Sequence, residues 1–437
     1  VLPIAIQNFM LALVSATDAI MLGWIDQTSL SAVSLAGQVQ FVLSLFISGI
    51  AAGAGIMAAQ YWGKQDAASI EKVIPIALRT NLLFSGLFTI LAGFCPEMLM
   101  RIFTNDAALV ASGSQYLRAV ALSYVLCGIS QVYLILLKKT GHAAVSSRIS
   151  STAVVLNIIL NAILIYGLCG APALGIRGAA YATVAARVVE LIWAYLETKK
   201  PERVRILWNR LFSSAGKILS EDFWRYTLPV LAASLVWGIA YVLYSVIMGH
   251  MGSDAVAANS ITSIAKSLLS CLIRGVSGGA GVLIGNLLGA NELEKAREYG
   301  GRLSHLSIAI GIVTGGLLML ISPAIVHFAP LSDTAAEYLQ YMLLFCGLNL
   351  MAQSVNTTVL DGIFCAGGDA KFDMQGNIGA MWCFSVPLGF LAAFWLKLPV
   401  MVVYCIVNLD EIVKLPAVYH HYKKYIWVRN ITRDVED

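Results

Sequence analysis

Charged residues are scarce in this chain. They account for 12% of its 437 residues, whereas about 25% is usual in soluble domains. Hydrophobic residues account for 58%, and a soluble protein of this length cannot bury that much apolar surface. The sequence also lacks the segments of about ten alternating apolar and polar residues that build membrane barrels. The composition therefore leaves the α-helical membrane proteins as the expected class.

Motifs of nucleotide-driven or metal-dependent chemistry are missing as well. The sequence contains no HExxH, no Walker loop and no GxGxxG, so neither ATP-driven transport nor a soluble enzyme activity has support. The eight cysteines stand singly, without a CxxC or Cys/His spacing, which indicates small buried apolar residues and not metal ligands. We therefore expect no enzyme activity and no organic cofactor.

Long apolar segments follow one another along the whole chain. A helix of about 20 mostly apolar residues crosses about 30 Å of hydrocarbon. About twelve segments meet this criterion: 2–23, 30–60, 73–95, 107–137, 143–168, 175–197, 222–249, 255–288, 300–328, 335–365, 374–396 and 398–420. The sequence therefore predicts an all-α polytopic membrane protein with twelve transmembrane helices in contact with the lipid bilayer.

The two halves of the sequence repeat one pattern. Matching residues lie 226 positions apart: Pro3 and Pro229, Gly23 and Gly249, Gly53-Ala54-Gly55 and Gly279-Ala280-Gly281, Gln60 and Asn286, Gly63 and Gly289. Repeated helix bundles are typical of secondary transporters, and two halves of six helices each begin on the same side of the membrane, with a cleft between them. The predicted division is a bundle at 1–198, a cytoplasmic linker at 199–221, a bundle at 222–425 and a cytoplasmic tail at 426–437.

Basic residues gather in every second loop and in the C-terminal tail, whereas the other loops carry few. Lys and Arg are retained on the cytoplasmic side, so the sequence predicts a multi-pass protein of the plasma (inner) membrane with both termini cytoplasmic. The basic segment 199–225 is the longest polar connection. Contact with lipid headgroups explains it better than nucleic-acid binding, and we expect no nucleic-acid partner.

Asp18 is the first polar residue that needs an explanation. A carboxylate inside hydrocarbon costs at least several kcal/mol, and no basic residue lies within helical reach of Asp18. Its partners must therefore come from other helices or from a bound ion. We interpret it as a functional residue.

The fifth and sixth spans offer neutral polar residues. Asn157 and Asn161 lie one helical turn apart, hence on one face. Their oxygens could complete a cation shell, or the two amides could hydrogen-bond between helices. Thr183 in the sixth span is a possible further ligand. Glu190 follows Arg187 by three positions, which indicates an internal ion pair.

The second half carries different chemistry. Lys266 and Arg274 are unexpected charges in the eighth span, and Asp361 in the tenth span could pair with either of them. Tyr241 and Tyr244 lie on the seventh helix, with Tyr244 at the position that Asp18 holds in the first half. These tyrosines could offer a cation–π surface to an organic cation, although ordinary packing explains them better.

Glycines recur four residues apart in the second and eighth spans, at Gly49 and Gly53 and at Gly275 and Gly279. Such pairs allow two helices to approach closely. The second pair encloses Ser277, and Gly275-Val276-Ser277-Gly278 resembles the serine motif of rhomboid intramembrane proteases, with His305 or His327 as the imagined base. The same glycine frame recurs in the first half without a serine in register, which argues against catalysis at Ser277.

Together, these residues resemble the multidrug and toxic compound extrusion (MATE) transporters over essentially the whole chain. The order and spacing of several short motifs carry the resemblance. They are Pro3, Asp18 and Met21-Leu22-Gly23; Gly53-Ala54-Gly55, Gln60 and Gly63; Asn157-x3-Asn161 with Leu164-Ile165-Tyr166-Gly167; Gly175 to Thr183; Pro229, Ile247-Met248-Gly249 and Gly279-Ala280-Gly281; and Gly367-Gly368-Asp369.

The resemblance implies two six-helix bundles forming a V around a central cavity. It also implies a monomeric secondary exporter that antiports amphipathic organic cations against a proton or sodium gradient by alternating access. The family's first-half cation site matches Asp18, Asn157, Asn161 and Thr183, where a sodium ion or a proton would bind. Asn161 stands where many relatives carry a second carboxylate. Pro3 matches a proline at which the first helix is proposed to bend.

The acidic pair that other relatives carry in the seventh and tenth helices is not matched, which argues against a cation site in the second half. A lipid-linked oligosaccharide flippase of the same superfamily is the alternative function. Lys266 and Arg274 would suit its anionic substrate, whereas Asp18 and the count of twelve spans favour the exporter.

Overall fold

The computed structural model describes residues 1–437 except 24–26, 171, 202, 207–210, 212–215, 330 and 434–437. Parts of the predicted linker and tail therefore lie outside the described residues. The described chain folds into helices joined by short turns and contains no strand.

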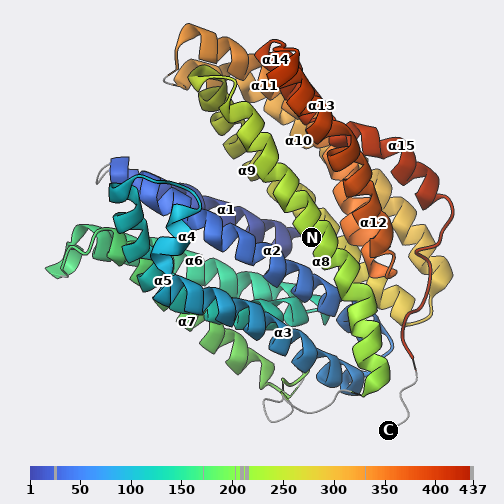
Figure 1. Ribbon diagram of the computed structural model, residues 1–437. Helices are drawn as coiled ribbons and strands as arrows, with labels where there is room; N and C mark the ends of the chain where they lie inside the picture. The colour runs from blue at the N-terminus through green and yellow to red at the C-terminus, as the bar shows by residue number, and fades with distance from the viewer. Residues whose placement is uncertain are drawn as a thin grey trace. The chain divides into compact units, whose positions relative to one another are not determined.

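The described part of the first half contains seven α-helices and one short 3-10 helix (Figure 1). They are α1 (Leu2–Gly23), α2 (Gln27–Gly63), α3 (Ala67–Phe94), α4 (Pro96–Arg101), α5 (Ala107–Lys139), α6 (Ala143–Tyr166), η1 (Leu168–Gly170) and α7 (Ile176–Thr198). The second half comprises α8 (Lys217–Gly249), α9 (Ser253–Gly289), α10 (Leu293–Phe328), α11 (Asp333–Thr357), η3 (Thr358–Phe364), α12 (Ala370–Asn377), η4 (Ile378–Ser385), α13 (Val386–Phe390), η5 (Leu391–Trp395), α14 (Val400–Val407) and α15 (Asp410–Tyr422).

The predicted spans correspond to these helices. Ten described helices are long and apolar enough to cross a membrane, and α1 and the pair α14 and α15 occupy the predicted first and twelfth spans. The prediction of an all-α polytopic membrane protein is confirmed. The twelfth span differs from the prediction in one respect, because its helix is interrupted between Val407 and Asp410.

Wide, π-helical turns distinguish the second half. Three such segments, η3, η4 and η5, occur there, and none occurs in the described part of the first half. η4 ends two residues before Pro387, whose missing N–H and ring prevent a regular α-helical turn at this point. Such turns are rare and are often found at functional sites.

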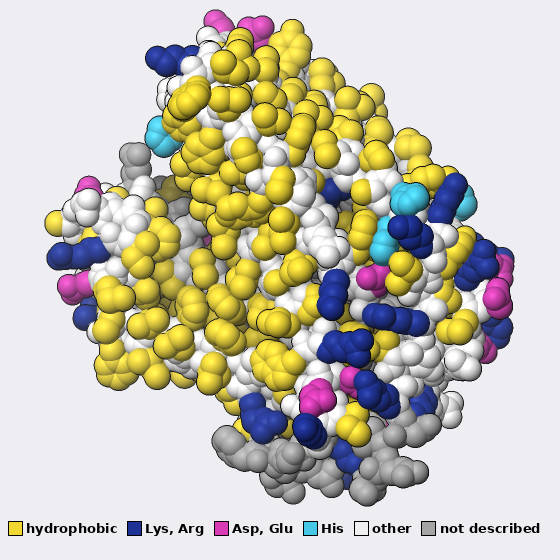
Figure 2. Space-filling model, turned by 45° about the vertical axis from the view of Figure 1, so that its right-hand side comes forward, with side chains coloured by type: hydrophobic (Ala, Val, Ile, Leu, Met, Phe, Trp, Pro, Cys, Tyr) yellow, Lys and Arg dark blue, Asp and Glu magenta, His cyan; other side chains and the backbone are white. Residues whose placement is uncertain are grey.

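The surface of the helices is apolar, as a bilayer requires. Large hydrophobic side chains are exposed, among them Phe94 on α3 at 81% and Phe328 on α10 at 83%. Figure 2 shows a broad apolar face, with Lys and Arg side chains gathered toward its lower right. An exposed apolar area of this extent is favourable only against lipid.

Contacts divide the described chain into two compact units. Residues 9–231 form one unit, and residues 1–8 with the residues from 232 onward form the other. The predicted bundles follow the order of the chain. In the structure, by contrast, the first turns of α1 belong to the unit formed mainly by the second half, and the first half of α8 belongs to the unit formed mainly by the first half. The division of the chain at 199–221 stays a prediction.

The glycine pairs explain this exchange. In the first unit, a Cβ atom on Gly49 would lie 2.9 Å from the Leu231 Cα. In the second unit, a Cβ atom on Gly275 would lie 2.9 Å from the Ala5 Cα. Ala5 and Leu231 are themselves 226 positions apart. The predicted close helix approach is therefore observed at both glycine pairs, in equivalent contacts.

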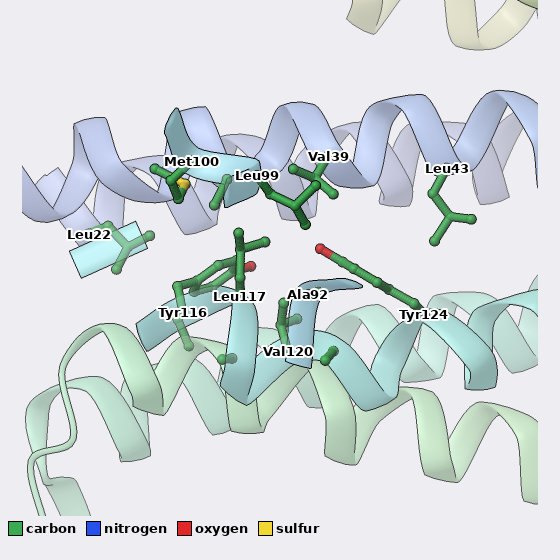
Figure 3. Packing of buried hydrophobic residues seen from close by; sticks show 14 of the residues in the cluster. Leu22, Val39, Leu43, Ala92, Leu99, Met100, Tyr116, Leu117, Val120 and Tyr124 are labelled. Atoms are coloured by element: carbon green, nitrogen blue, oxygen red, sulfur yellow. The ribbon is translucent and has the colours of Figure 1, made fainter. Parts of the chain in front are cut away.

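A core of apolar side chains supports the first unit (Figure 3). Leu22 from α1, Val39 and Leu43 from α2, and Tyr116 and Tyr124 from α5 are members of this cluster. All of them are at most 9% exposed. This packing holds the C-terminal half of α1 against α2 and α5, and thereby fixes the position of the residues on α1.

Candidate functional site

Three helices of the first unit bring the four predicted residues of the first-half site together. Asp18 comes from α1, Asn157 and Asn161 come from α6, and Thr183 comes from α7. The Asn161 Nδ2 donates to Asp18 Oδ1 at 2.5 Å and to Asn157 Oδ1 at 3.2 Å. The Asn157 Nδ2 donates in turn to Thr183 Oγ1 at 3.3 Å. A chain of hydrogen bonds therefore links Asp18 to Thr183.

Thr183 determines which groups donate and which accept along this chain of hydrogen bonds. The Thr183 hydroxyl donates to the carbonyl oxygen of Ala179 at 3.0 Å, so its oxygen is left to accept from Asn157. Asn157 then presents its own oxygen to Asn161, and Asn161 presents its amide hydrogens to Asp18. A single intrahelical bond on α7 thus orients an N–H group toward the carboxylate.

The site is partly buried and contains one carboxylate. Asn161 is fully buried, Asn157 is 6% exposed and Asp18 is half-buried. No Lys, Arg or His within the described residues forms an ion pair with Asp18. The Asn161 Oδ1 is buried and has no hydrogen-bond partner in the described part of the chain, so the site retains one free oxygen acceptor beside the carboxylate.

Neighbouring groups hold the helices in place around this site. The Tyr166 hydroxyl donates to the carbonyl oxygen of Met21 at 2.7 Å, which joins α6 to α1 one turn beyond Asp18. Gly178 allows α7 to approach the backbone of α6, because a Cβ atom there would overlap the Leu164 carbonyl group. These contacts fix the distances between the three helices.

The second buried acid of this half, Glu190, is explained by an ion pair. Arg187 donates to its two carboxylate oxygens at 2.8 and 3.0 Å, and the Ser130 hydroxyl donates at 2.6 Å. Glu190 is 1% exposed, so these three bonds compensate for its lost hydration. The predicted ion pair is confirmed.

The predicted charged residues of the second half form no ion pair with one another in the described chain. Lys266 donates to Asn349 Oδ1 at 3.5 Å, and Arg274 and Asp361 are exposed. Within the described residues, Asp361 forms an ion pair with neither Lys266 nor Arg274, so the pairing considered from the sequence is not observed. Asp361 lies in the π-helical segment η3.

The tyrosines of α8 are accounted for by packing. Tyr241 stacks on Trp237 with ring centroids 5.5 Å apart. Tyr244 is 8% exposed and belongs to a core cluster with Ile247 and Met381. This agrees with the packing interpretation. Tyr244, which replaces Asp18 in the repeat, thus completes a core where the first half has a charge.

Pro3 and Pro229 occupy different places in their helices. Pro3 lies in the first turn of α1, where its missing N–H breaks no hydrogen bond within the described helix. Pro229 lies inside α8, where one carbonyl group loses its partner. Bending at Pro3 therefore stays a prediction.

Ser277 shows no sign of a catalytic arrangement. Its hydroxyl donates to the carbonyl oxygen of Thr357 at 2.9 Å, which joins α9 to α11. His305 instead contacts the carbonyl oxygen of Gly301 on its own helix. In the described chain no histidine partners Ser277, and the structural role of this serine is to connect two helices.

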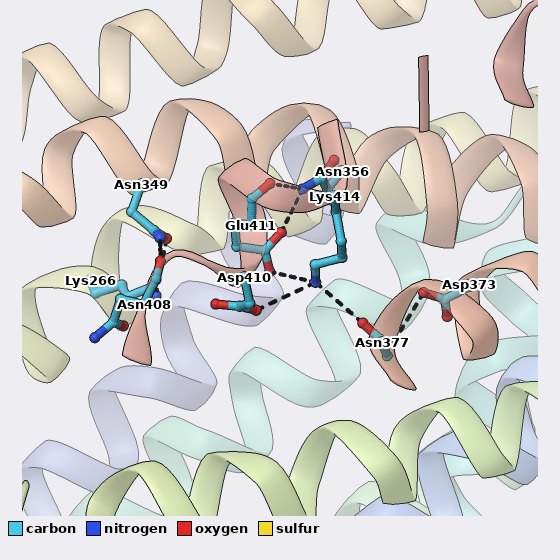
Figure 4. Close-up of polar contacts among 9 residues, drawn as sticks. All are labelled: Lys266, Asn349, Asn356, Asp373, Asn377, Asn408, Asp410, Glu411 and Lys414. Atoms are coloured by element: carbon cyan, nitrogen blue, oxygen red, sulfur yellow. Dashed lines mark hydrogen bonds and ion pairs between the residues drawn. The ribbon is translucent and has the colours of Figure 1, made fainter. Parts of the chain in front are cut away.

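The structure contains a second polar cluster that was not predicted from the sequence (Figure 4). It consists of Asn356 from α11, Asp373 and Asn377 from α12, and Asp410, Glu411 and Lys414 from α15. We refer to these six residues as the second-half cluster. Lys414 lies at its centre and donates to Glu411 Oε1 and to Asn377 Oδ1, each at 3.2 Å.

A signal for this cluster was present. The predicted span 398–420 contains two acids and a lysine, Asp410, Glu411 and Lys414, within five residues. Each charge inside a membrane span requires a partner, and the spacing from Asp410 to Lys414 predicts a contact on one helix face. The contributions of Asn356, Asp373 and Asn377 could not be predicted, since they lie on other helices.

The fold and the sites define an integral membrane protein of many helices, with buried polar clusters in both halves. A model of the MatE family matches residues 3–163 and 229–391. The two matches begin at Pro3 and Pro229, which reproduces the repeat offset. The chain therefore belongs to the MATE family of multidrug efflux transporters, as the resemblance implied.

Individual relatives support this assignment. The chain is 21% identical over 427 residues to the uncharacterized transporter YisQ of Bacillus subtilis, covering 98% of this chain and 93% of the relative. It is 24% identical over 390 residues to the probable multidrug resistance protein NorM of Agrobacterium fabrum, covering 87% and 83%. The relatives do not favour the flippase alternative.

Solved structures show the same fold. A MOP superfamily transporter from Pyrococcus furiosus superimposes with a TM-score of 0.87 at 19% identity, over 97% of this chain and 94% of that chain. An outward-facing multidrug resistance MATE family transporter superimposes with a TM-score of 0.86 at 20% identity, with the same coverage. The twelve-helix architecture of the family is therefore shared by this chain.

Proposed function

We propose that this protein exports amphipathic organic cations across the plasma (inner) membrane in exchange for protons. The observation that carries the proposal is Asp18: a half-buried carboxylate with an amide donor at 2.5 Å and no cationic side chain to neutralise it among the described residues. A group of this kind can change its charge while the surrounding packing stays intact. Both termini are cytoplasmic, the protein acts as a monomer, and it catalyses no chemical reaction.

Antiport follows from competition between two ligands. With Asp18 ionised, its negative charge favours binding of a cationic substrate. A proton on Asp18 removes that attraction and the desolvation cost of the bare charge. Coupling requires that proton and substrate favour different states of the transporter, because a ligand with equal affinity for both states shifts nothing. Alternating access then releases the substrate on the side from which the proton enters.

Sodium is the second candidate for the coupling ion. The observation that favours it is the set of oxygen atoms around Asp18, since Asn157, Asn161 and Thr183 all carry one and the Asn161 Oδ1 lacks a partner. Hard cations prefer such oxygen ligands. The proton is the first candidate because the group of Asn161 that faces Asp18 Oδ1 is an N–H donor, which cannot bind a metal ion.

The test is uptake of a fluorescent organic cation into inverted vesicles, with proton and sodium gradients imposed separately. Asp18→Asn keeps the size of the side chain and removes its charge. We expect uptake driven by a proton gradient in the wild type and uptake at the level of vesicles without the protein in Asp18→Asn.

Glu97→Gln is the matched control, because Glu97 is an exposed carboxylate of the same half, 3.8 Å from Arg118. It should transport like the wild type. Uptake driven only by sodium would establish the second candidate. Uptake that ignores Asp18→Asn would contradict the proposal.

A further inference from the structure

The second-half cluster contains more negative than positive charge. Asp373, Asp410 and Glu411 are carboxylates, and within the described residues Lys414 is the only cation that forms an ion pair with any of them. Lys414 lies 3.5 Å from Asp410 and 3.2 Å from Glu411, and both Lys414 and Asp410 are 5% exposed. With all four groups charged, the cluster carries a formal charge of −2.

Charges on neighbouring elements do not complete the balance. Lys266 and Arg274 on α9 and Asp361 on η3 lie within electrostatic reach of the cluster. Four acids and three bases leave a formal charge of −1. The buried hydroxyl of Tyr244 also lies within electrostatic reach of Asp410 and carries no positive charge. Asp373 is buried, and an uncompensated buried charge costs several kcal/mol, so the cluster needs one more positive charge.

Asp373 is the carboxylate with the least compensation. Glu411 accepts from Lys414 and, at 2.7 Å, from the Asn356 Nδ2, and Asp410 pairs with Lys414. Asp373 is 7% exposed, and its hydrogen bond in the structure is an amide N–H of Asn377 at 3.2 Å. The oxygen of that same amide accepts from Lys414, so Asn377 stands between the ammonium group and Asp373.

One buried oxygen in the cluster indicates a missing hydrogen-bond donor. Asn356 is 1% exposed, and its Nδ2 donates to the carbonyl oxygen of Glu411 and to Glu411 Oε2, each at 2.7 Å. Its Oδ1 is buried and has no partner among the described residues. A buried acceptor without a donor costs about 1–3 kcal/mol. The cluster therefore lacks a positive charge, and Asn356 within it lacks a hydrogen-bond donor.

A metal ion does not fit this cluster. The Lys414 ammonium group occupies the place between the carboxylates that a cation would take (Figure 4). In the described chain no group of three or more His, Cys, Asp or Glu side chains has the arrangement of a metal site. The exchangeable positive charge is therefore a proton.

We propose that the second-half cluster is a second proton site, at which Asp373 takes up and releases one proton in each transport cycle. This inference rests on the proposed function of proton-coupled export. The proton leaves a water-derived hydronium ion for the exposed carboxylate of Asp361, and then passes to an oxygen of Asp373. An O–H bond breaks on Asp361 and one forms on Asp373, and the charge of the cluster and its neighbours changes from −1 to 0. Asp361 lies within electrostatic reach of Asp373.

The first arm of the test measures how many protons accompany each substrate. In liposomes with the membrane potential clamped at zero, we would determine the opposing gradient of tetraphenylphosphonium that stops net flux at a fixed pH difference. Each coupled proton contributes about tenfold to that gradient per pH unit, since a tenfold ratio equals about 1.4 kcal/mol. We expect about hundredfold for the wild type and about tenfold for Asp373→Asn.

Matched variants separate this role from a structural one. Glu298→Gln removes an exposed acid paired with Arg302 and should keep the wild-type gradient, as should Asp373→Glu, which retains a carboxyl group. Asp361→Asn should slow proton exchange and leave the limiting gradient unchanged. The inference would be overturned if net flux through the wild type stopped at a tetraphenylphosphonium gradient of about tenfold. It would also be overturned if Asp373→Asn reached the same limiting gradient as the wild type.

The second arm does not depend on transport. Infrared difference spectra of the purified protein between acidic and basic pH report carboxyl groups that gain a proton, through their C=O stretch. We expect a band that is absent in Asp373→Asn and present in Glu298→Gln, and an unchanged band in Asp373→Asn would overturn the inference. A wild type that moves no substrate under a proton gradient would instead overturn the proposed function, and the infrared arm would then decide about Asp373 alone.

Discussion

The two halves of this protein share a backbone plan and differ in their chemistry. The first-half site holds one carboxylate and three neutral side chains, whereas the second-half cluster and its neighbours hold four acids and three bases. Each contains one buried asparagine oxygen that has no hydrogen-bond partner among the described residues, on Asn161 in the first half and on Asn356 in the second. The two halves therefore share the positions at which helices contact each other and differ in their buried polar side chains.

Packing explains why the two kinds of position behave differently. At Gly49 and Gly275 a Cβ atom would lie 2.9 Å from the backbone of a crossing helix, so any larger residue would push that helix away. At the equivalent positions Asp18 and Tyr244 the two halves carry side chains of different size and charge. A charged side chain at this position requires a hydrogen-bond or ionic partner, and a tyrosine requires apolar neighbours to pack against.

The largest effect is expected from Lys414→Met, which has no equivalent in the first half. It leaves Asp410, Glu411 and Asp373 buried without a cation, and losing one partner of a buried ion pair typically costs 3–5 kcal/mol. Thermal unfolding of the purified protein measures this. Lys295→Met is the control, because Lys295 forms an exposed pair with Glu292 at 2.9 Å and such pairs contribute about 0–1 kcal/mol. Equal melting temperatures would show that Lys414 does not neutralise the cluster.

An intermediate and equal effect is expected from Gly49→Ala and Gly275→Ala. Each added methyl group meets a backbone atom, and overpacking of this kind typically costs about 1–3 kcal/mol. Gly86→Ala is the matched control, since nothing lies within 4 Å of its Cβ position and replacing a helical glycine should stabilise α3 by up to about 1 kcal/mol. A difference between Gly49→Ala and Gly275→Ala in the measured free energy of unfolding would show that the two contacts are not equivalent.

The smallest effect on stability is expected from Asn161→Asp, which makes the first-half site more like the second-half cluster. Two carboxylates in contact cannot both be ionised without a cation, so the variant should bind sodium. Sodium should then raise its melting temperature, because a ligand that binds only the folded state stabilises it. The wild type should not respond, and potassium serves as the control salt. A sodium response of the wild type would favour sodium as its coupling ion.

Much of the first-half site could be predicted and little of the second. Asp18, Asn157, Asn161 and Thr183 were each identifiable because a polar residue in an apolar span is conspicuous and because family motifs surround them. The same reasoning singled out Lys266, Arg274 and Asp361, which make no ion pair with one another in the described chain. It missed Asp373 and Lys414, because their partnership passes through Asn377 and joins helices that sequence spacing does not relate.

The sequence by itself determined the membrane class, the number of spans, the repeat and the glycines at which helices cross. These properties depend on composition and on spacing along single helices, which a linear pattern records. Only the tertiary structure decided that Asn161 turns an N–H group toward Asp18, that the ends of α1 and α8 are exchanged between the contact units, and that Lys414 faces three carboxylates. The physical reason is that hydrogen-bond direction and charge balance are properties of groups brought together from distant helices, and their sum exists only once those helices have packed.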